Sequence, residues 1–400
     1  MLGAGLQGCC VALELARRGH RVDLYDRCDK ALTQASYWNE GKIHLGLVYA
    51  NDPIGRTHVK MLDGALRFET LIRRWLGGPI PGVSSPFYYA VHRTSLLDTP
   101  RIIQHFEAVA AGYRILCAQH RLGYFDAGDG PLYEELSGAL RTKLFDGAVV
   151  TAAFRTIERA VNVRAIAAAL SAAIAASDRI SFHGACDVVA VNCDNGSGYT
   201  VQGTTANAAF TEVYADVVNA LWGGRLAIDR THGLVADRPW LYRTKLGIIL
   251  RGKSGRPVVP STTFVLDAYG DTVSYDDGSV YLSWYPECMI GVSAELESPD
   301  FVGKLDMAER RRLALKSIAA MAELVPSLAP YTDGADIEQI GGGIIFAWGA
   351  ADIDDPVSEL HRRYDIGVHS TGRYHSIDTG KYTMAPYFAI EACDRIEGLA

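Results

Sequence analysis

Three glycines near the start of the chain have the spacing of a turn that binds a phosphate-linked cofactor. They form Gly3-x-Gly5-x-x-Gly8, and the residues that follow have apolar side chains at the spacing of one helix face. In such a turn the first glycine permits a tight turn, the second lets the backbone approach a pyrophosphate, and the third lets the helix lie close to a sheet. The helix N-terminus adds free N–H groups and a partial positive charge. We therefore predict a dinucleotide site whose contacts include Leu6 and Gln7.

An acidic residue follows where dinucleotide folds bind a ribose. Residues 22–25 have the composition of a short buried strand, and Asp26 follows it, about 20 residues after the glycines. Its carboxylate can accept hydrogen bonds from ribose hydroxyls, and the neighbouring Arg27 is predicted as a further contact. The first strand of such a unit should contain roughly five residues before Gly3. Fewer are present, so we expect the chain to start inside or just after that strand.

A polar segment, residues 35–46, carries several side chains that could exchange protons. Hydroxyl, carboxylate and ammonium groups soon after a ribose-binding residue suit hydrogen bonds to phosphates and ring edges. The predicted cofactor contacts here are Ser36, Glu40, Gly41 and Lys42. For His44 two interpretations stay open, a functional histidine and a satisfied core histidine.

Two later stretches contain glycine turns of the same general kind. Residues 215–224 have the pattern of a buried parallel strand that runs into a glycine turn. Small residues permit close backbone approach to a ligand, so Ala220 and Gly223 are predicted contacts. Near the C-terminus, Gly380 and Lys381 precede the closing helix, and we predict that they contact the same ligand.

Composition narrows the classes of function. The chain has 400 residues, 48% of them hydrophobic and 21% charged, with a formal net charge of -7. This is ordinary for a soluble globular protein and gives no electrostatic support for nucleic-acid binding. No apolar run is long enough to span a membrane. The eight cysteines lack metal-site spacing, so we expect reduced thiols, no metal and a cytoplasmic location.

The elements that would position these residues follow from periodicity. The chain alternates between helical and extended patterns. Helices are predicted at 53–76, 100–118, 161–177, 299–324 and 380–396. Strands are predicted at 87–92, 148–159, 180–191, 198–204, 208–214, 246–250, 263–266, 272–275, 280–285 and finally 364–369, with a polar loop at 370–379.

These elements predict an α/β fold with two domains. The first is a discontinuous, Rossmann-like domain that binds FAD or NAD(P), because nucleotide-binding pieces are scattered along the chain. It is predicted to comprise residues 1–80, 152–235 and 338–400. The second is an antiparallel-sheet substrate domain, predicted to comprise 81–151 and 236–337.

Four segments resemble the D-amino-acid-oxidase/glycine-oxidase-like (DAO) family of FAD-dependent oxidoreductases. They are residues 3–26, residues 35–46, the "D-x-V-V-N-A" strand and turn at 215–224, and the turn and helix at 375–389. The resemblance implies FAD, a two-domain fold and oxidation of a C–N or C–O bond by hydride transfer to flavin N5. Asp378-Thr379-Gly380-Lys381 departs from the family's glycine- and histidine-rich turn, and no arginine matches the family's carboxylate-binding residue.

In such an enzyme the flavin carries the chemistry, and the protein orients the substrate and tunes the site. A base must accept the substrate's proton, and a cation near the flavin would stabilise its reduced form. The candidates for these roles are His44, Lys42 and Lys381, followed by His369, His375 and Lys245. Aromatic residues Tyr281, Trp284 and Tyr285 line the substrate face in one interpretation and are ordinary sheet residues in the other.

Three functions remain open at this stage. The first is oxidation of a small amine, amino acid or hydroxy acid, with oxygen or another electron acceptor as the partner. The second is a flavoprotein monooxygenase or another NAD(P)H-reduced enzyme, although no second glycine fingerprint for a nicotinamide is present. The third is a non-catalytic flavin-binding scaffold. The substrate, the acceptor, the base, the mode of FAD attachment and the oligomeric state do not follow from the sequence.

Overall fold

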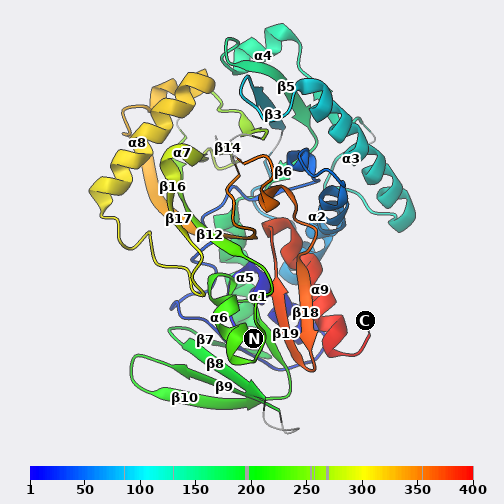
Figure 1. Cartoon of the computed structure of the whole chain (residues 1–400), viewed down its shortest axis with the longest axis vertical. Coiled ribbons are helices and arrows are strands. Elements are labelled where there is room, and N and C mark those ends of the chain that lie inside the picture. Colours follow the sequence, from blue (N-terminus) through cyan, green and yellow to red (C-terminus); the bar gives the residue numbers. More distant parts are fainter. Residues whose placement is uncertain are drawn as a thin grey trace.

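Two sheets of different kinds organise the structure, a computed structural model (Figure 1). It describes residues 1–84, 86–128, 130–193, 198–252, 255, 257–266, 270–353 and 355–399. The first sheet lies beside the N-terminus and the second occupies the upper half of Figure 1. Segments far apart in the sequence meet in both sheets, as the α/β prediction requires.

The first sheet is mostly parallel. In it β1 (Val22–Tyr25) pairs with β7 (Ile180–His183), and β11 (Val217–Asn219) pairs with β19 (Tyr374–Asp378), both in parallel register. Strand β18 (Gly367–Thr371) pairs antiparallel with β19. Leu2 forms parallel bridges to both Tyr25 and Asn219 and so joins the two groups of strands.

Four helices pack beside this sheet and against one another. They are α1 (Leu6–Arg17), α2 (Arg56–Leu76), α5 (Val163–Ala176) and α9 (Ala385–Ile396). Helix α1 is buried along almost its whole length, which explains its small and apolar residues. Because the closing helix α9 contacts α1 closely, the two ends of the chain share one hydrophobic core.

The second sheet has nine strands among the described residues. Eight follow one another in the order β16 (Met289–Ser293), β12 (Trp240–Leu250), β15 (Val280–Trp284), β14 (Gly270–Ser274), β13 (Ser261–Phe264), β3 (Phe87–His92), β5 (Val150–Thr156) and β4 (Tyr133–Glu135), and β17 (Ile337–Trp348) also pairs with β12. The sheet is antiparallel apart from the parallel pair of β13 and β3. The predicted antiparallel strands between residues 239 and 287 pair antiparallel, and the parallel pair arises where β3 joins them.

Further elements surround the second sheet and the space between the sheets. The helices are α3 (Thr99–His120), α4 (Gly138–Leu144), α6 (Arg225–Thr231), α7 (Tyr285–Cys288) and α8 (Met307–Leu324). The 3-10 turns are η1 (Leu47–Tyr49), η2 (Trp222–Gly224), η3 (Pro326–Tyr331), η4 (Glu359–His361) and η5 (Tyr382–Met384). The antiparallel strands β8 (Asp187–Cys193), β9 (Tyr199–Thr204) and β10 (Ala209–Tyr214) form a small sheet at the lower end of Figure 1. Strand β2 (Lys42–Ile43) pairs with β6 (Arg159–Ala160).

Two element predictions are wrong. The predicted helix 299–324 begins only at Met307, because Asp306 and Glu309 form a capping box there. The predicted loop 370–379 contains the end of β18 and the fully buried strand β19. Polar residues are tolerated in β19 because buried partners satisfy them: Ser376 donates a hydrogen bond to Asp229, and Tyr374 does the same.

The predicted domain boundaries stay predictions. Two of the predicted boundaries cut through strands of the second sheet: the boundary at 151/152 lies inside β5, and the boundary at 337/338 lies inside β17. Both strands pair with the nine-stranded sheet.

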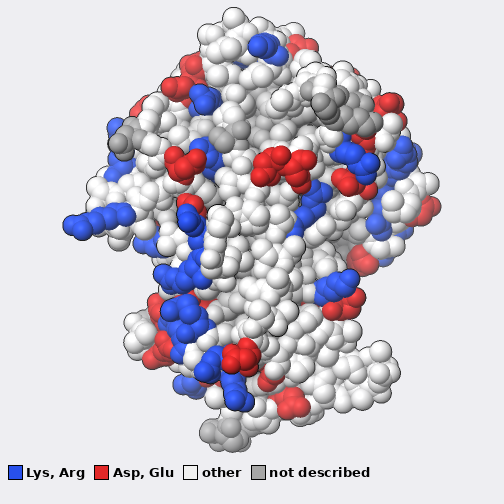
Figure 2. Space-filling model, turned by 180° about the vertical axis from the view of Figure 1, so that it is seen from behind, with Lys and Arg blue, Asp and Glu red and all other residues white. Residues whose placement is uncertain are grey.

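The surface and the helices add two observations. On the face shown in Figure 2, acidic and basic side chains are interspersed and leave wide uncharged areas between them. Within the described ranges, no helix has the length and apolar character needed to cross a bilayer.

Candidate cofactor and substrate site

The glycine turn before α1 is packed so tightly that side chains are excluded. Gly3 has a φ of 92°, and a Cβ there would lie 2.7 Å from the carbonyl oxygen of Ala220. A Cβ on Gly8 would overlap the carbonyl oxygen of Gly3. Ala220 was predicted as a close contact of the cofactor, and that role stays a prediction. Backbone packing is therefore the reason for glycine at both positions.

Side chains hold this turn at its edges. Asp26 accepts hydrogen bonds from the N–H of Ala4 at 2.6 Å and from that of Cys28 at 2.8 Å, one on each carboxylate oxygen. The Ser36 hydroxyl accepts a hydrogen bond from the N–H of Leu6 at 2.8 Å. Each carboxylate oxygen of Asp26 keeps a further lone pair. Asp26 is thus placed to accept from a ribose hydroxyl while it fixes the turn.

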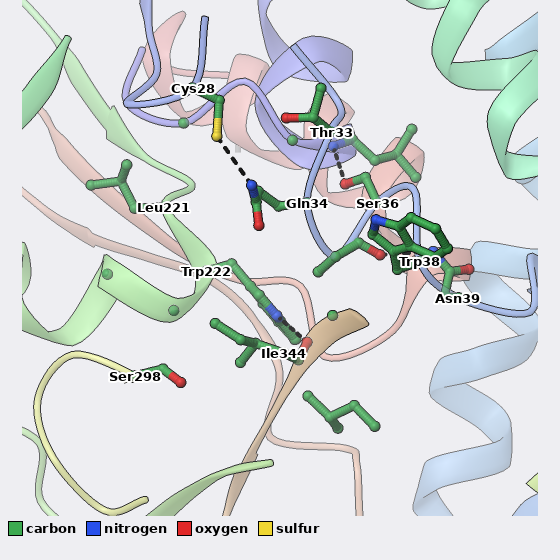
Figure 3. Close-up of a pocket in the computed structure, with 18 of the residues that line it drawn as sticks. Cys28, Thr33, Gln34, Ser36, Trp38, Asn39, Leu221, Trp222, Ser298 and Ile344 are labelled. Atoms are coloured by element: carbon green, nitrogen blue, oxygen red, sulfur yellow. Dashed lines mark hydrogen bonds between the residues drawn. The ribbon is translucent and has the colours of Figure 1, made fainter. Parts of the chain in front are cut away.

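A cavity of about 900 Å³ starts at this turn and passes between the two sheets. Figure 3 shows part of its wall, where Cys28 and Ser36 lie on one side and Ser298 and Ile344 on the other. The predicted site residues that line it are Gly3, Gly5, Leu6, Gln7, Asp26, Arg27, Ser36, Glu40, Lys42, His44, Ala220, Gly223, Gly380 and Lys381. Gly8 and Gly41 are not lining residues, and a Cβ on Gly41 would overlap the carbonyl oxygen of Val161.

The cavity fits an extended dinucleotide. One end has the glycine turn and Asp26, the other end has Lys42, His44 and Lys381, and the volume lies in the upper range of ligand pockets. Between the two ends of the cavity, Trp38 packs directly against the backbone of Gly341, where a Cβ would overlap its indole ring. The residues present therefore suit FAD, with the adenosine part near Asp26 and the flavin near His44.

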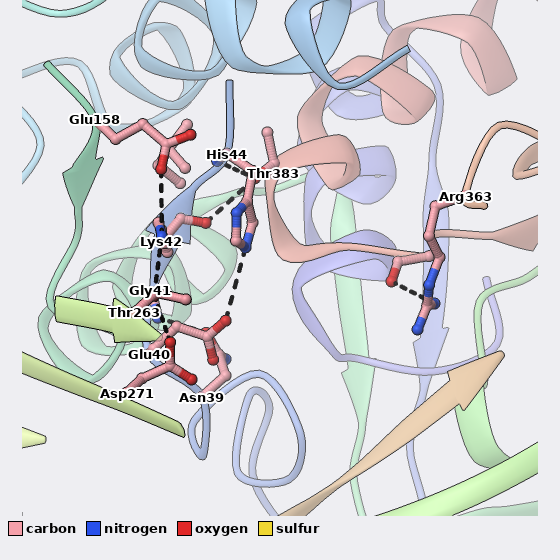
Figure 4. A network of polar contacts seen from close by, with 12 residues as sticks. Asn39, Glu40, Gly41, Lys42, His44, Glu158, Thr263, Asp271, Arg363 and Thr383 are labelled. Atoms are coloured by element: carbon pink, nitrogen blue, oxygen red, sulfur yellow. Dashed lines mark hydrogen bonds and ion pairs between the residues drawn. The ribbon is translucent and has the colours of Figure 1, made fainter. Parts of the chain in front are cut away.

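Lys42 is enclosed at the second end of the cavity, with only 1% of its surface exposed. Its ammonium donates a hydrogen bond to Thr263 at 2.9 Å and lies 3.4 Å from Glu158 (Figure 4). It also lies 4.1 and 3.8 Å from the ring centroids of Phe87 and Tyr89. Burial lowers the pKa of Lys42, and the carboxylate of Glu158 opposes that shift. Its predicted catalytic role stays a prediction, since these contacts suit a group that holds the segment in place.

The partners of Lys42 connect two segments to the second sheet. Glu158 accepts hydrogen bonds from the hydroxyl of Tyr89 and from the N–H of Leu45, both at 2.7 Å. Thr263 donates at 2.5 Å to Asp271, whose other carboxylate oxygen lies 3.4 Å from the ammonium of Lys245. Two lysine–carboxylate pairs are therefore bridged by one threonine behind the cavity wall.

His44 lies at the cavity, and within the described part of the chain neither ring nitrogen has a hydrogen-bond partner although the side chain is buried. Its Nε2 lies 3.7 Å from a carboxylate oxygen of Glu40, which is an ion-pair distance longer than a hydrogen bond. Burial lowers the pKa of His44, and the positive charge of Lys381 lowers it further. The ring is therefore neutral near pH 7, with a nitrogen lone pair directed to its surroundings. Of the two interpretations of His44, these contacts favour the functional one, which stays a prediction.

Two further cations line the same end. Arg363 is buried and donates hydrogen bonds through one terminal nitrogen to the carbonyl oxygens of Phe346 and Gly380, at 2.8 and 3.3 Å, while its Nε has no partner. Figure 4 shows Arg363 opposite His44 across the site. The Lys381 ammonium lies 5.9 Å from the ring centroid of Tyr49. Burial lowers the pKa of Lys381, and Glu40 opposes that shift.

Sequence reasoning missed Glu158 and Arg363. Glu158 is the one acidic residue in the extended stretch 148–159. A single acid in an apolar strand is a weak sign of a buried charge. Arg363 follows Arg362 in a segment without periodicity, and nothing in the sequence distinguishes the buried arginine from the exposed one.

The lesser candidates lie away from the cavity. His369 is exposed, and His375 exchanges a hydrogen bond with Ser370 at 2.8 Å. The three aromatic candidates do not line the cavity either; Tyr281 and Trp284 belong to hydrophobic clusters of the second sheet, and the Tyr285 hydroxyl donates to Asp352 at 2.8 Å. Across the described residues, no group of three or more His, Cys, Asp or Glu side chains is arranged to hold a metal ion.

The fold and the cavity are those of a two-sheet protein with a dinucleotide-binding turn. The model of the DAO family, described as FAD dependent oxidoreductase, matches residues 2–369. The chain belongs to this family, which confirms the resemblance and the predicted fold class. The protein is therefore an FAD-dependent oxidoreductase, and its cofactor is FAD.

Solved structures and one curated protein resemble the chain. Glycine oxidase from Geobacillus kaustophilus has a TM-score of 0.67 at 15% identity, over 100% of this chain and 94% of its own. L-alpha-glycerophosphate oxidase from Mycoplasma pneumoniae, solved with FAD bound, has a TM-score of 0.67 at 13% identity, over 99% and 93%. FAD-dependent monooxygenase FPY4 from Fusarium mangiferae is 35% identical over 68 residues, which are 17% of this chain and 18% of that protein.

Proposed function

We propose that this protein oxidises a small molecule at a carbon that carries a nitrogen or an oxygen. The observation that carries the proposal is His44, a buried histidine at the end of the cavity opposite the dinucleotide turn, whose two ring nitrogens have no hydrogen-bond partner among the described residues. When bound, FAD accepts a hydride from the substrate carbon at flavin N5. The names of the similar structures include substrates of both kinds, glycine and glycerophosphate.

His44 supplies the proton acceptor. Oxidation of an alcohol or amine carbon removes a proton from the heteroatom as the hydride leaves, and a neutral imidazole can take it. The backbone N–H of His44 donates to Thr383 at 2.9 Å, and Thr383 in turn donates to the carbonyl of Lys42, so the segment is held from two sides. The ring is thereby kept at the cavity by contacts that do not engage its nitrogens.

The test is anaerobic mixing of the FAD-loaded protein with amines, amino acids and hydroxy acids while the flavin absorbance is followed. His44→Gln should slow flavin reduction about 10²–10⁴-fold, the usual contribution of a general base, without loss of FAD. His120→Gln, on the exposed end of α3, is the matched control and should react like the parent. Equal reduction rates in the His44→Gln variant and the parent would contradict the role of His44.

The pH profile provides a second measurement. Because the pKa of His44 is lowered, the base is neutral near pH 7, and the rate of reduction by a hydroxy acid should fall only in the acidic range, below the ordinary histidine pKa of about 6.5. Lys381→Met removes a positive charge that lowers this pKa, so the acid limb should move to higher pH. A limb that stays in place would show that another group titrates.

A second function has one observation in its favour, the short match to a protein named as a monooxygenase. Rapid bleaching of the flavin by NAD(P)H, together with no response to the substrate panel, would favour it over the oxidase or dehydrogenase reaction.

A further inference from the structure

Three consecutive glycines, residues 341–343, lie inside β17 where another segment packs on the strand. A Cβ on Gly341 would overlap the indole ring of Trp38, and a Cβ on Gly343 would lie 3.0 Å from the Cα of Ala35. Neither glycine has the positive φ that favours glycine over other residues. Glycine weakens a strand interior, so the close approach of the other segment accounts for both positions.

The segment that lies on β17, residues 35–39, is held at several points. The Ser36 hydroxyl accepts a hydrogen bond from the N–H of Leu6 in the glycine turn, at 2.8 Å. The Asn39 amide donates to the carbonyl oxygen of Ala35 at 2.9 Å and accepts from the N–H of Gly41 at 2.8 Å. The segment is therefore fixed between the dinucleotide turn and the second sheet, and its side chains have defined positions.

Trp38 is the large aromatic side chain of this segment, and it lies at the wall of the cavity (Figure 3). Its indole packs on the backbone of Gly341 and against a hydrophobic cluster of the second sheet that includes Phe87. The Phe87 ring lies 4.1 Å from the ammonium of Lys42. Trp38 therefore shares its cluster with the residues around Lys42 and not with the turn near Asp26. A tryptophan held in this way loses little conformational freedom when a ligand binds.

We propose that the indole of Trp38 packs against the isoalloxazine ring of bound FAD, and that Gly341 gives the indole the space to do so. The cavity suits FAD with the flavin at the end that contains Lys42 and His44. Two planar aromatic systems in contact stabilise each other beyond the area that they bury. Trp38 is then a binding residue for the cofactor ring, and its role does not depend on which substrate the flavin oxidises.

The test separates the two ends of the cavity with two ligands. ADP contains the adenosine and pyrophosphate part of FAD and lacks the isoalloxazine ring. Protein freed of its cofactor is titrated with FAD and with ADP, and calorimetry gives both Kd values. Trp38→Leu should weaken FAD binding about 5- to 100-fold, the range for loss of one aromatic stack, and should leave the Kd of ADP within about twofold of the parent.

A second measurement uses the FAD-loaded protein. An indole in contact with the isoalloxazine ring quenches flavin emission, so Trp38→Leu should raise the fluorescence of bound FAD. Trp38→Phe keeps a smaller ring, and its affinity for FAD should lie between those of the parent and Trp38→Leu. If Trp38→Leu fails to fold, the Kd values of FAD and ADP in Trp38→Phe decide the question.

Gly341→Ala tests the packing behind the indole. Its methyl group would push Trp38 toward the cavity, so we expect FAD to bind about tenfold more weakly in this variant. The same substitution should have a much smaller effect when Trp38 is already leucine, because residues in contact are energetically coupled. Tyr88→Leu is the control: Tyr88 is a half-buried aromatic residue on β3 that faces Phe145 outside the cavity, and the variant should bind both ligands like the parent.

Three results would overturn the inference. Trp38→Leu could leave both the Kd of FAD and the flavin emission unchanged, which would place the isoalloxazine ring elsewhere. FAD and ADP could lose affinity equally, which would assign Trp38 to the stability of the cavity as a whole. ADP alone could lose affinity, which would place the adenine against Trp38.

Discussion

At the end of the cavity between Gly3 and Asp26, side chains satisfy backbone N–H groups of the turn, whereas around His44 several buried side-chain atoms have no hydrogen-bond partner among the described residues. In the glycine turn, Asp26 and Ser36 accept hydrogen bonds from backbone N–H groups. The satisfied polar groups of the glycine turn suit a cofactor that stays bound. The unused donors and acceptors around His44 suit a substrate that binds and is released in each catalytic cycle.

A large expected effect on cofactor binding tests the glycine-turn end. Gly8→Ala places a Cβ against the carbonyl oxygen of Gly3, so α1 must move away from the turn. Overpacking of this kind costs about 1–3 kcal/mol, and we expect FAD to bind about a hundredfold more weakly. The measurement is the Kd of FAD by fluorescence. Gly78→Ala is the control, because a Cβ there meets nothing within 4 Å. Unchanged FAD affinity in Gly8→Ala would show that the turn is not tightly packed.

Substitutions near His44 should change the free energy of unfolding. Lys42→Met leaves the buried carboxylate of Glu158 without its cation and should cost about 3–5 kcal/mol in the free energy of unfolding. The double variant Lys42→Met/Glu158→Gln removes the uncompensated charge, keeps an oxygen for the N–H of Leu45 and should recover part of the loss. Denaturant unfolding at pH 7 measures both. A double variant no more stable than the single one would mean that the pair is not the cause.

A third prediction concerns pH and α1, far from His44. Burial would raise the pKa of Glu14, but hydrogen bonds from Arg17, Trp75 and Arg18 outweigh it and lower the pKa to about 2. The resulting stability is fully present above pH 4.5 and is lost as the pH falls toward 2. Glu14→Gln should cost about 1–3 kcal/mol at pH 7 and flatten the pH dependence in that window.

The control for this prediction is Glu69→Gln. Glu69 forms an ion pair with a half-exposed arginine, Arg73, at 3.3 Å, and such pairs contribute about 0–1 kcal/mol. Thermal unfolding between pH 2 and 7 compares the two variants. Parallel pH curves for Glu14→Gln and the parent would contradict the assignment of this acid sensitivity to Glu14.

The smallest expected effect again belongs to the glycine-turn end. Ser36→Ala removes the acceptor for the N–H of Leu6 and should weaken FAD binding by a few-fold, in line with about 0.5–1.5 kcal/mol for one hydrogen bond. Ser36→Thr keeps the hydroxyl and should bind FAD nearly as well as the parent. If both variants bind FAD equally, the hydroxyl has no role in shaping the turn.

Alternation and composition along the sequence predicted two short buried strands correctly. The strand at 22–25 and the strand at 87–92 were predicted at the bounds that the structure has. Strand β19 was missed because its polar residues predict a loop, and only the buried partner Asp229 makes them acceptable in a sheet. The start of α8 was missed although Asp306 and Glu309 have the spacing of a capping box.

The sequence by itself determined the dinucleotide end, because glycine spacing and Asp26 act through the backbone near them in the chain. Only the tertiary structure decided the reactive end. His44 carries no sequence mark of its environment, and its neutral, unpartnered ring results from burial and from the distant Lys381. Likewise, Arg363 and Glu158 become functional candidates only when the fold removes them from water. Desolvation and charge pairing depend on which segments meet, and a single sequence does not display that directly.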